Sequence, residues 1–381
     1  MNATQDREGR RIALVLPDLG GGGAERVTLT LAEEFVARGF AADVVLMRCE
    51  GVFVEQVPRT LRLVDLKAPR IRQAPLALAC YLRAERPDAI IVNMWPLTTA
   101  CIVARTLAKS KVRLLTCEHV TLSNSYRHWG WFHGFLLRRS IAALHPFADV
   151  RVTVSSGVAD DLAAITGIGR SRFDVVYNPI AVRPPTSDDA AAVGAAWRGW
   201  TGKRIITVGA LKEQKNQALL FRAFARLLET VEARLMLLGE GPLRGELEAF
   251  ARKLGVANKI VMPGFIPDPS PFYRTADLFV LSSDYEGFGN VIVEALACGL
   301  PVVSTDCPSG PAEILENGRW GRLTPVGDAQ ALAEAMADSL AADHDREAPK
   351  RRATDFSPAL AAERYLRLLF PESIDGMSGR R

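Results

Sequence analysis

The feature that most constrains the fold is a glycine-punctuated stretch between two short apolar runs, at 277–281 and 300–304. Residues 283–289 have the composition of a loop, and the residues that follow form a helix that is apolar nearly all round. Gly299 fits the end of that helix. Strand, loop, helix and strand in this order predict parallel strands. The loop then lies at a carboxyl end, where open parallel sheets bind ligands.

Two carboxylates stand out in this stretch. Glu286 lies in the loop, and Glu294 is the only charged residue of the apolar helix. Burying a carboxylate is costly unless polar groups meet it. Glu294 therefore requires a polar partner.

A second glycine-rich loop lies near the start of the chain. It comprises residues 20–23, between a strand at 11–16 and a helix at 24–38, and a further strand at 42–47 completes a βαβ unit. The glycine spacing is not that of the dinucleotide fingerprint, and no acidic residue ends the second strand. Glycines here let backbone N–H groups approach a phosphate or a sugar at a helix N-terminus. A plain turn is the alternative interpretation.

The same alternation of strands and helices continues along the chain and predicts two doubly wound α/β domains with a cleft between them. In the first domain we expect further strands at 61–66, 89–93, 112–118, 150–154 and 174–177, and helices at 75–86, 98–110, 131–144 and 157–166. In the second domain we expect strands at 204–208, 234–238, 260–262, 277–281 and 300–304, and helices at 217–230, 243–254 and 328–341, followed by a last helix at 358–369.

The domain boundaries follow from this pattern. We predict a first domain over residues 1–181, a proline- and alanine-containing linker over 182–202, and a second domain over 203–355. Residues 356–381 form the C-terminal helix and tail. A length of 381 residues with 48% hydrophobic residues suits two globular domains of ordinary size.

Composition also bears on location. The chain contains no apolar run of about 18 residues or more, so we expect no membrane span. Its polar start does not resemble a secretory signal. The six cysteines include no CxxC pair, which favours reduced thiols in the cytoplasm and argues against a zinc site.

The charge is unevenly distributed. Residues 1–180 carry 23 Lys and Arg against 17 Asp and Glu, a net charge of +6; the totals of 47 and 43 then leave 24 against 26, a net of −2, for the remainder. A basic first half indicates an anionic partner such as a membrane surface or a phosphorylated lipid. An ordinary solvated surface is the alternative, because no run of like charges appears.

The segment 126–139 is the candidate membrane contact. Aromatic rings interleaved with arginines suit the headgroup layer of a bilayer. The residues expected to make this contact, with membrane or acceptor, are Arg127, Trp129, Trp131, Arg138 and Arg139. Packing of this helix into the core of the first domain is the alternative.

Four motifs together resemble a known family. They are Gly21-Gly22-Gly23-Ala24-Glu25-Arg26-Val27, Val208-Gly209-Ala210-Leu211 through Lys215-Asn216, Gly239-Glu240-Gly241-Pro242, and the two glutamates with seven residues between them before Ala297-Cys298-Gly299-Leu300-Pro301. In combination they are similar to the retaining glycosyltransferases of family 4, also called group 1. The resemblance implies the GT-B fold, with two facing Rossmann-like domains and a C-terminal helix that packs back toward the first.

The resemblance also implies roles for single residues. Glu294 would bind the ribose hydroxyls of a nucleotide sugar, Glu286 would contact the transferred sugar, and Lys215 would neutralise the leaving diphosphate. The other residues expected to bind the donor are Gly21, Gly22, Gly23, Gly209, Lys212, Gly239, Phe265, Gly287, Phe288, Gly289 and Asn290.

His119, at the end of a first-domain strand, matches a family position at which a histidine faces the donor sugar. The resemblance implies that it contacts the sugar or supports catalysis. A core histidine bonded to a backbone carbonyl is the alternative.

The implied reaction is front-face transfer with retention, in which the leaving diphosphate helps to deprotonate the acceptor hydroxyl. No metal or other cofactor is expected. Residues 305–315 resemble family members that use UDP-hexoses or UDP-N-acetylhexosamines, which favours a UDP-sugar over a GDP-sugar. The acceptor would be a lipid-linked oligosaccharide, a lipopolysaccharide or a similar glycan. The protein would be cytoplasmic and peripheral on the inner-membrane surface, and no nucleic-acid partner is expected.

Ala210 departs from the family pattern, because an arginine often follows the glycine of this loop. One diphosphate cation is therefore missing unless Lys212 replaces it. Two other functions stay open. One is a nucleotide-sugar epimerase on the same fold, and the other is a non-catalytic, nucleotide-sugar-binding component of a polysaccharide-assembly complex.

Overall fold

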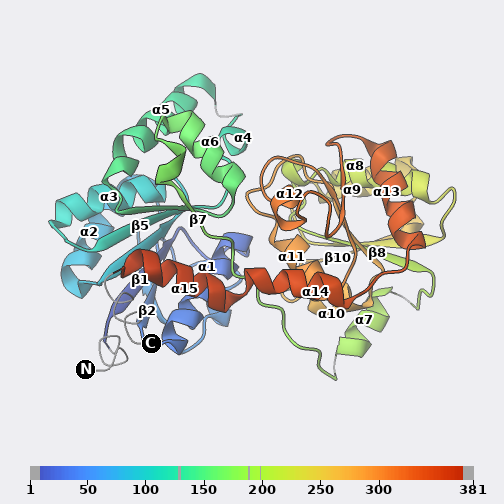
Figure 1. Ribbon diagram of the computed structural model, residues 1–381, viewed down its shortest axis with the longest axis horizontal. Coiled ribbons are helices and arrows are strands. Elements are labelled where there is room, and N and C mark those ends of the chain that lie inside the picture. Colours follow the sequence, from blue (N-terminus) through green and yellow to red (C-terminus); the bar gives the residue numbers. More distant parts are fainter. Residues whose placement is uncertain (1–8, 128–129, 188, 198, 372–381) are drawn as a thin grey trace, which may run out of the picture. The chain divides into compact units, whose positions relative to one another are not determined.

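The computed structural model describes residues 9–127, 130–187, 189–197 and 199–371, and the chain folds into two compact units (Figure 1). Unit 1 comprises residues 1–179 and 357–381, and unit 2 comprises residues 180–356. The last helix of the chain, α15 (Pro358–Leu369), thus belongs to unit 1 although it follows unit 2 in the sequence.

Unit 1 is built on a parallel sheet that has seven strands among the described residues, in the order β3-β2-β1-β4-β5-β6-β7. The strands are β1 (Arg11–Leu16), β2 (Ala41–Leu46), β3 (Arg62–Asp65), β4 (Ala89–Asn93), β5 (Arg113–Glu118), β6 (Val150–Thr153) and β7 (Asp174–Val175). Every residue of β4 is buried, as expected for a central parallel strand covered on both faces.

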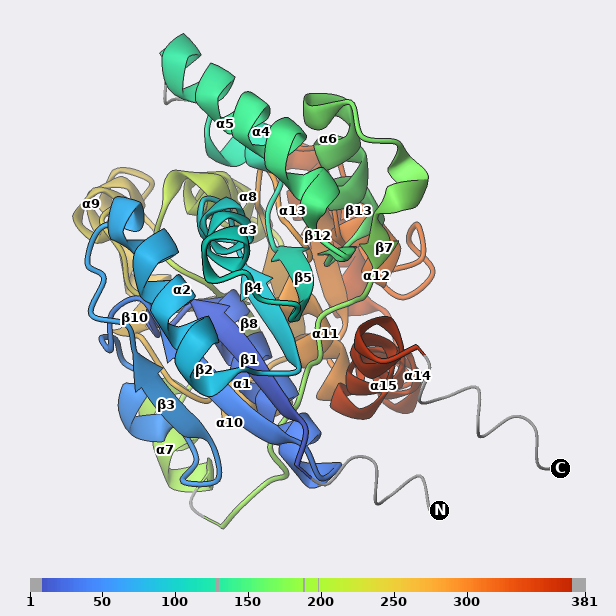
Figure 2. The same cartoon turned by 90° about the vertical axis from the view of Figure 1, so that its left-hand side faces the viewer.

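The helices of unit 1 cover this sheet. They are α1 (Gly23–Ala37), α2 (Ala74–Glu85), α3 (Leu97–Ala108), α4 (Leu122–Ser125), α5 (Gly130–Leu144), α6 (Ser156–Thr166) and α15. Helices α2 and α3 lie side by side and share one apolar core with β1 and β4 (Figure 1 and Figure 2). Helix α15 packs against α1, and Arg113 donates from Nε to the carbonyl of Leu368 at 3.0 Å.

Unit 2 repeats the plan with six described strands, in the order β10-β9-β8-β11-β12-β13. The strands are β8 (Lys203–Val208), β9 (Ala233–Leu238), β10 (Ile260–Gly264), β11 (Leu278–Leu281), β12 (Val302–Thr305) and β13 (Arg322–Thr324). The helices are α7 (Asp189–Trp197), α8 (Gln217–Leu227), α9 (Arg244–Lys253), α10 (Ser270–Thr275), α11 (Asn290–Ala297), α12 (Pro311–Ile314), α13 (Ala329–Ala341) and α14 (Glu347–Ala353).

Single turns of 3-10 helix complete the described secondary structure. In unit 1 they are Val54–Gln56, Ile71–Gln73, His145–Phe147 and Arg170–Arg172, and in unit 2 they are Glu213–Lys215, Ala257–Lys259 and Thr354–Phe356.

Each sheet reverses its winding once. In unit 1 the chain moves outward from β1 to β3 and then restarts at β4 on the other side of β1. In unit 2 it moves outward from β8 to β10 and restarts at β11 beside β8. The loops that follow the two central strands diverge at such a switch point and leave a crevice at the carboxyl edge, where ligands of doubly wound folds bind.

The predicted α/β class is confirmed, but the segment predicted as a linker differs. Residues 182–202 belong to unit 2 and contain α7. Trp197 is 1% exposed and donates its indole N–H to Oγ1 of Thr275 at 3.2 Å. Arg183 pairs with Asp189 at 2.7 Å. The burial of one large aromatic ring therefore turns a stretch of linker-like composition into part of a domain.

Candidate active site

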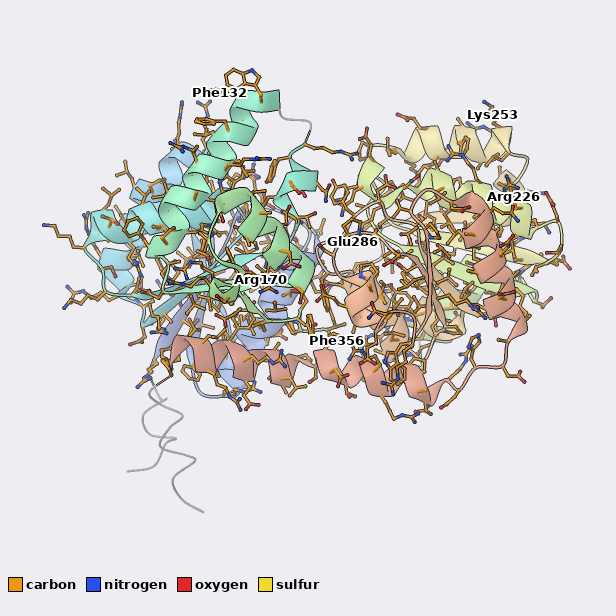
Figure 3. All side chains as sticks on the ribbon, turned by 45° about the horizontal axis from the view of Figure 1, so that its top comes forward. Phe132, Arg170, Arg226, Lys253, Glu286 and Phe356 are labelled. Atoms are coloured by element: carbon orange, nitrogen blue, oxygen red, sulfur yellow. The ribbon has the colours of Figure 1, made fainter. Side chains whose placement is uncertain are left out.

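The switch point of unit 2 brings two of the predicted catalytic residues together. Lys215 lies in the loop after β8, and Glu286, labelled in Figure 3, lies in the loop between β11 and α11. Strands β8 and β11 are paired, so the two loops leave the sheet side by side. Lys215 Nζ lies 2.6 Å from Glu286 Oε1.

This ion pair is firmly held. Ser283 Oγ donates to the same oxygen of Glu286 at 2.6 Å, and Glu286 is 5% exposed. The two loops are also bonded directly, because Gln214 donates to the Tyr285 carbonyl at 2.8 Å. A partly buried pair of this kind is stable only when its remaining polar atoms are satisfied. The cluster thus fixes an ammonium group and a carboxylate at the carboxyl edge of the sheet.

Helix α11 presents its positive end at the same edge. Gly289 is its N-cap residue and takes a φ of 100°, a conformation that glycine adopts without penalty. Gly287, Phe288 and Gly289 are buried, and Asn290 begins the helix. The amino end of a helix favours anions. The predicted donor residues of this loop therefore lie where a phosphate would be stabilised.

The loop after β12 packs closely against this one. A Cβ atom on Gly310 would lie 1.8 Å from the Phe288 carbonyl oxygen, and Glu286 donates its backbone N–H to the Pro308 carbonyl at 3.2 Å. Gly310 was not among the predicted residues. Its φ of 98°, next to a φ of 68° at Ser309, marks a tight turn that the Pro-Ser-Gly sequence alone indicates only weakly.

Glu294 accepts a hydrogen bond from a side chain of unit 2. It is 8% exposed on α11, and the hydroxyl of Tyr273 on α10 donates to its Oε2 at 3.1 Å. Tyr273 is 1% exposed. The sequence prediction did not include Tyr273, because α10 has only six residues and no periodic pattern that would reveal it.

The other predicted residues of unit 2 line the carboxyl ends of β8, β9 and β10. Gly239 and Gly209 let the loops after β8 and β9 approach closely, since a Cβ on Gly239 would lie 2.0 Å from the Gly209 carbonyl oxygen. Phe265 follows β10 and is 38% exposed. Lys212 and Ala210 are both exposed in the loop that leads to Lys215.

In unit 1 the corresponding edge carries His119, directly after β5. Its Nε2 lies 2.9 Å from Oδ1 of Asn93, at the end of β4. Because the Asn93 amide nitrogen donates to the Val15 carbonyl at 3.1 Å, Oδ1 is the acceptor and His119 Nε2 must carry the proton. His119 Nδ1 is then the acceptor nitrogen. It is buried without a hydrogen-bond partner among the described residues.

Burial lowers the pKa of His119 to about 4, so the ring is neutral near pH 7. Cys117 Sγ lies 3.4 Å from His119 Nε2 and 3.3 Å from the hydroxyl of Tyr365 on α15. Burial raises the pKa of the Cys117 thiol to about 12, so this sulfur is also uncharged. The last helix of the chain thus contributes to the surroundings of His119, which sequence patterns cannot reveal.

Glu118 is a buried carboxyl that was not among the predicted site residues. It is 1% exposed and accepts hydrogen bonds from the Trp95 backbone N–H at 3.0 Å and from Thr98 Oγ1 at 2.9 Å. Burial raises its pKa to about 7. Glu118 ties the loop after β4 and the start of α3 to the end of β5.

The glycine-rich loop of unit 1 follows β1 at the same edge. Gly21 has a φ of 103°, Gly22 is the N-cap residue of α1, and Gly23 is the first residue of that helix. A Cβ on Gly22 would lie 2.4 Å from Oε2 of Glu25. The loop therefore places the amino end of α1 at the switch point of unit 1.

Helix α5 has an exposed apolar face. Trp131 is 84% exposed, Phe132 58% and Phe135 55%, whereas Leu137 and Ile141 are buried. Phe132 is labelled on this helix in Figure 3. The predicted contact residues Arg127, Arg138 and Arg139 are exposed, and Trp129 lies outside the described residues. Only the second half of the helix packs into unit 1, so the core-packing alternative does not account for its first turns.

Within the described residues, no three His, Cys, Asp or Glu side chains lie close enough to hold a metal ion. No described helix combines the length and the apolar character that a bilayer span requires.

Paired loops, a fixed lysine and a helix N-terminus lie at the switch point of a Rossmann-like unit, which is where doubly wound α/β folds bind ligands. Residues 21–183 match the family model described as Glycosyltransferase Family 4, and residues 202–342 match the model described as Glycosyl transferases group 1. The chain belongs to these family 4, group 1 glycosyltransferases.

Two curated relatives are similar over 65% or more of this chain. The N-acetylgalactosamine-N,N'-diacetylbacillosaminyl-diphospho-undecaprenol 4-alpha-N-acetylgalactosaminyltransferase of Campylobacter jejuni is 29% identical, over 90% of this chain and 94% of its own length. The lipopolysaccharide 1,6-galactosyltransferase of Salmonella typhimurium is 29% identical, over 65% of this chain and 64% of its own.

The fold matches solved glycosyltransferases as well. The crystal structure of a glycosyltransferase from Rickettsia africae aligns with a TM-score of 0.78 at 18% identity, over 94% of this chain and 97% of that one. The predicted GT-B architecture of two Rossmann-like domains is confirmed.

Proposed function

We propose that this glycosyltransferase moves a hexose or an N-acetylhexosamine, with retention, from a UDP-sugar to a lipid-linked oligosaccharide, a lipopolysaccharide or a similar glycan. The observation that carries the proposal is the Lys215–Glu286 pair at the switch point of unit 2, 2.6 Å apart and beside the loop that opens α11. The cation and the helix N-terminus can bind the diphosphate of such a donor, and the carboxylate can accept hydrogen bonds from its sugar.

Each group has a distinct role in this proposal. Lys215 and the amino end of α11 stabilise the negative charge that develops on the diphosphate as it leaves. Glu286 accepts hydrogen bonds from hydroxyls of the transferred sugar. Glu294, oriented by Tyr273, accepts hydrogen bonds from the ribose hydroxyls. Because Lys215 supplies the cation, we propose that no metal is needed.

The bond changes follow from front-face transfer. The acceptor hydroxyl oxygen bonds to the anomeric carbon on the face from which the diphosphate departs. The bond from that carbon to the phosphate oxygen breaks, and its electron pair leaves with UDP. The hydroxyl proton passes to the departing phosphate. In unit 1, the acceptor nitrogen Nδ1 of His119 receives a hydrogen bond from a sugar hydroxyl, since the ring is held neutral and in one tautomer.

The proposed acceptor rests on two observations. The relatives named above act, by their names, on a diphospho-undecaprenol-linked sugar and on lipopolysaccharide. The exposed aromatic face of α5 and the net charge of +6 over residues 1–180 suit an anionic bilayer surface. We propose that the protein is peripheral on the cytoplasmic face of the inner membrane, where α5 contacts the lipid.

The test is transfer by the purified full chain. Radiolabelled UDP-glucose, UDP-galactose, UDP-N-acetylglucosamine and UDP-N-acetylgalactosamine are each incubated with a membrane lipid extract, and label is measured in the organic phase and in lipopolysaccharide. We expect one UDP-sugar to label the acceptor, and Glu286→Gln to reduce the rate at least tenfold. Release of UDP without any acceptor would favour an epimerase, and binding without turnover a non-catalytic component. Either result contradicts the proposal.

A further inference from the structure

The edge of the unit 1 sheet opposite to His119 carries a basic hollow that the proposed transfer reaction does not use. Two adjoining depressions of about 370 and 630 Å³ share the loop 109–112 between α3 and β5. The second also takes in the loop 86–88 between α2 and β4. Strand β5 runs six residues from this edge to His119, roughly 20 Å, so the hollow is separate from that histidine.

The lining is strongly cationic. The basic hollow is defined by Arg83, Arg86, Arg105, Lys109 and Lys111. Its two carboxylates have protein partners. Asp149 pairs with Arg105 and accepts from the Leu114 backbone N–H at 2.7 Å, and Asp88 accepts from the Arg11 backbone N–H at 2.7 Å. Five cations against two carboxylates leave a net charge of +3.

Most of these cations are not neutralised locally. Among the described residues, Arg105 forms an ion pair with Asp149, whereas Arg86, Lys109 and Lys111 form no ion pair. Arg83 donates to the Leu107 carbonyl and so remains charged and unpaired with an acid. Clustered positive charge from two loops raises the local electrostatic potential and attracts an anion.

Two of the cations also occupy backbone positions that suit glycine. Arg86 ends α2 with a φ of 47°, and Lys109 ends α3 with a φ of 52°. The left-handed conformation at a helix end is usually taken by glycine, because a side chain is disfavoured there. Helices α2 and α3 pack side by side, so their ends present these two side chains to the same hollow. A helix C-terminus does favour a cation, which is the rival explanation to be tested.

We propose that the basic hollow binds a phosphate group, at a site distinct from the donor site of unit 2. A guanidinium group can donate two parallel hydrogen bonds to the oxygens of one phosphate, whereas an ammonium group contributes charge without a fixed geometry. Two exposed apolar residues lie next to the lining cations. Arg105 donates to the carbonyl of Phe147, which is 64% exposed, and Arg83 donates to the carbonyl of Leu107, which is 43% exposed. The phosphate would belong either to the headgroup of an anionic lipid or to a soluble phosphorylated compound.

The test compares Arg86→Gly/Lys109→Gly with the wild-type full chain. Glycine removes the charge and suits the backbone, so the melting temperature should be unchanged or higher. Lys67→Gly is the matched control, because Lys67 also has a left-handed φ, of 50°, but lies outside the hollow. Binding of inorganic diphosphate is measured by calorimetry with UDP present, and UDP binding is measured separately.

We expect the double variant to weaken diphosphate binding at least tenfold, whereas Lys67→Gly and the UDP affinity stay as in the wild type. Sedimentation with phosphatidylglycerol and phosphatidylcholine vesicles then assigns the source. If the double variant also loses binding to phosphatidylglycerol vesicles, the phosphate belongs to a lipid headgroup. If it keeps that binding, the phosphate belongs to a soluble compound. Unchanged diphosphate binding in the double variant, or an equal loss in Lys67→Gly, would overturn the proposal. This proposal rests on the proposed function only in placing the donor site in unit 2. Because UDP binding is measured separately from diphosphate binding, failure of the donor-site proposal can be distinguished from failure of the phosphate-site proposal.

Discussion

At the scale of single residues, the site depends on how its buried carboxylates are stabilised by hydrogen bonds and an ion pair. Glu286 shares one oxygen between Lys215 and Ser283, and Glu294 receives a hydrogen bond from Tyr273. These arrangements hold each carboxylate in position before any ligand binds. Preorganised groups of this kind stabilise a bound or developing charge without reorganising.

The pairing of Glu294 with Tyr273 leads to a first prediction. Glu294→Ala should weaken UDP binding by about 1–3 kcal/mol, because it removes charge-assisted hydrogen bonds to the ribose. Tyr273→Phe, which keeps the ring but not the orienting hydroxyl, should cost about 0.5–1.5 kcal/mol. Isothermal titration of UDP measures both. If Glu294→Ala lowered only the melting temperature and left the UDP affinity intact, the carboxylate would be purely structural.

At the scale of elements, Glu118 joins β5 to the loop after β4 and to α3. Between pH 4.5, the ordinary pKa of a glutamate, and about pH 7, this carboxyl keeps its proton in the folded chain and loses it in the unfolded chain. The unfolded state therefore binds fewer protons, and the stability falls as the pH rises through that window.

The second prediction follows from this sign. Glu118→Gln mimics the protonated carboxyl, so its stability relative to the wild type should increase between pH 5 and pH 8, by roughly 1–3 kcal/mol. Urea unfolding of both proteins across this range is the measurement. A stability difference that does not change with pH would show that Glu118 does not titrate in the folded protein in this window.

Helix α5 is the second element with a testable surface. Trp131 and Phe135 are exposed, and burying each in a bilayer interface is worth up to about 1.5–3 kcal/mol. Trp131→Ser/Phe135→Ser should lower binding to vesicles that contain anionic lipid by tenfold or more, with little change in stability. Leu360→Ser, on α15 and 46% exposed, is the control. Equal vesicle binding by both variants in a flotation assay would exclude α5 as the contact.

At the scale of the whole molecule, the alternation of strands and helices was enough to predict the two α/β units. The bounds of β1, β4 and α15 agree with the prediction because long or fully apolar segments carry a clear period. Helices α10, α12 and α14 were not predicted, since none exceeds seven residues. Helix α7 was missed because the burial of Trp197 is a tertiary effect.

Sequence motifs also single out candidate site residues, two of which, Lys215 and Glu286, form an ion pair in the structure. Glu286, Glu294 and Lys215 stand in motifs, so their sequence context identifies them. Sequence context does not identify the residues around them. Tyr273, which donates to Glu294, lies on a helix too short to predict. Tyr365, which contacts Cys117 beside His119, is 248 residues from that cysteine. Side chains that come from separate elements meet only through the topology of the sheet.

The division into units gives a prediction for the whole chain. Unit 2 is continuous in sequence, and its first and last residues are joined by a hydrogen bond from the Ile180 N–H to the Phe356 carbonyl at 2.9 Å. It has its own apolar core. A fragment over 180–356 should therefore fold and bind UDP as the full chain does, but transfer no sugar. An aggregated fragment, or a folded one without UDP affinity, would contradict the assignment of the donor site to unit 2.

The most direct test of the central claim, that the switch point of unit 2 binds the UDP moiety of a sugar donor, is a melting-temperature titration of the full chain with UDP, GDP and ADP. A ligand at a hundred times its Kd adds about 2.7 kcal/mol to the stability of the folded protein. UDP should therefore raise the melting temperature by about 5–10 °C, GDP and ADP should raise it much less, and the UDP effect should shrink in Glu294→Ala. A melting temperature that responds to none of the three nucleotides, or that responds to UDP equally in Glu294→Ala, would contradict the account.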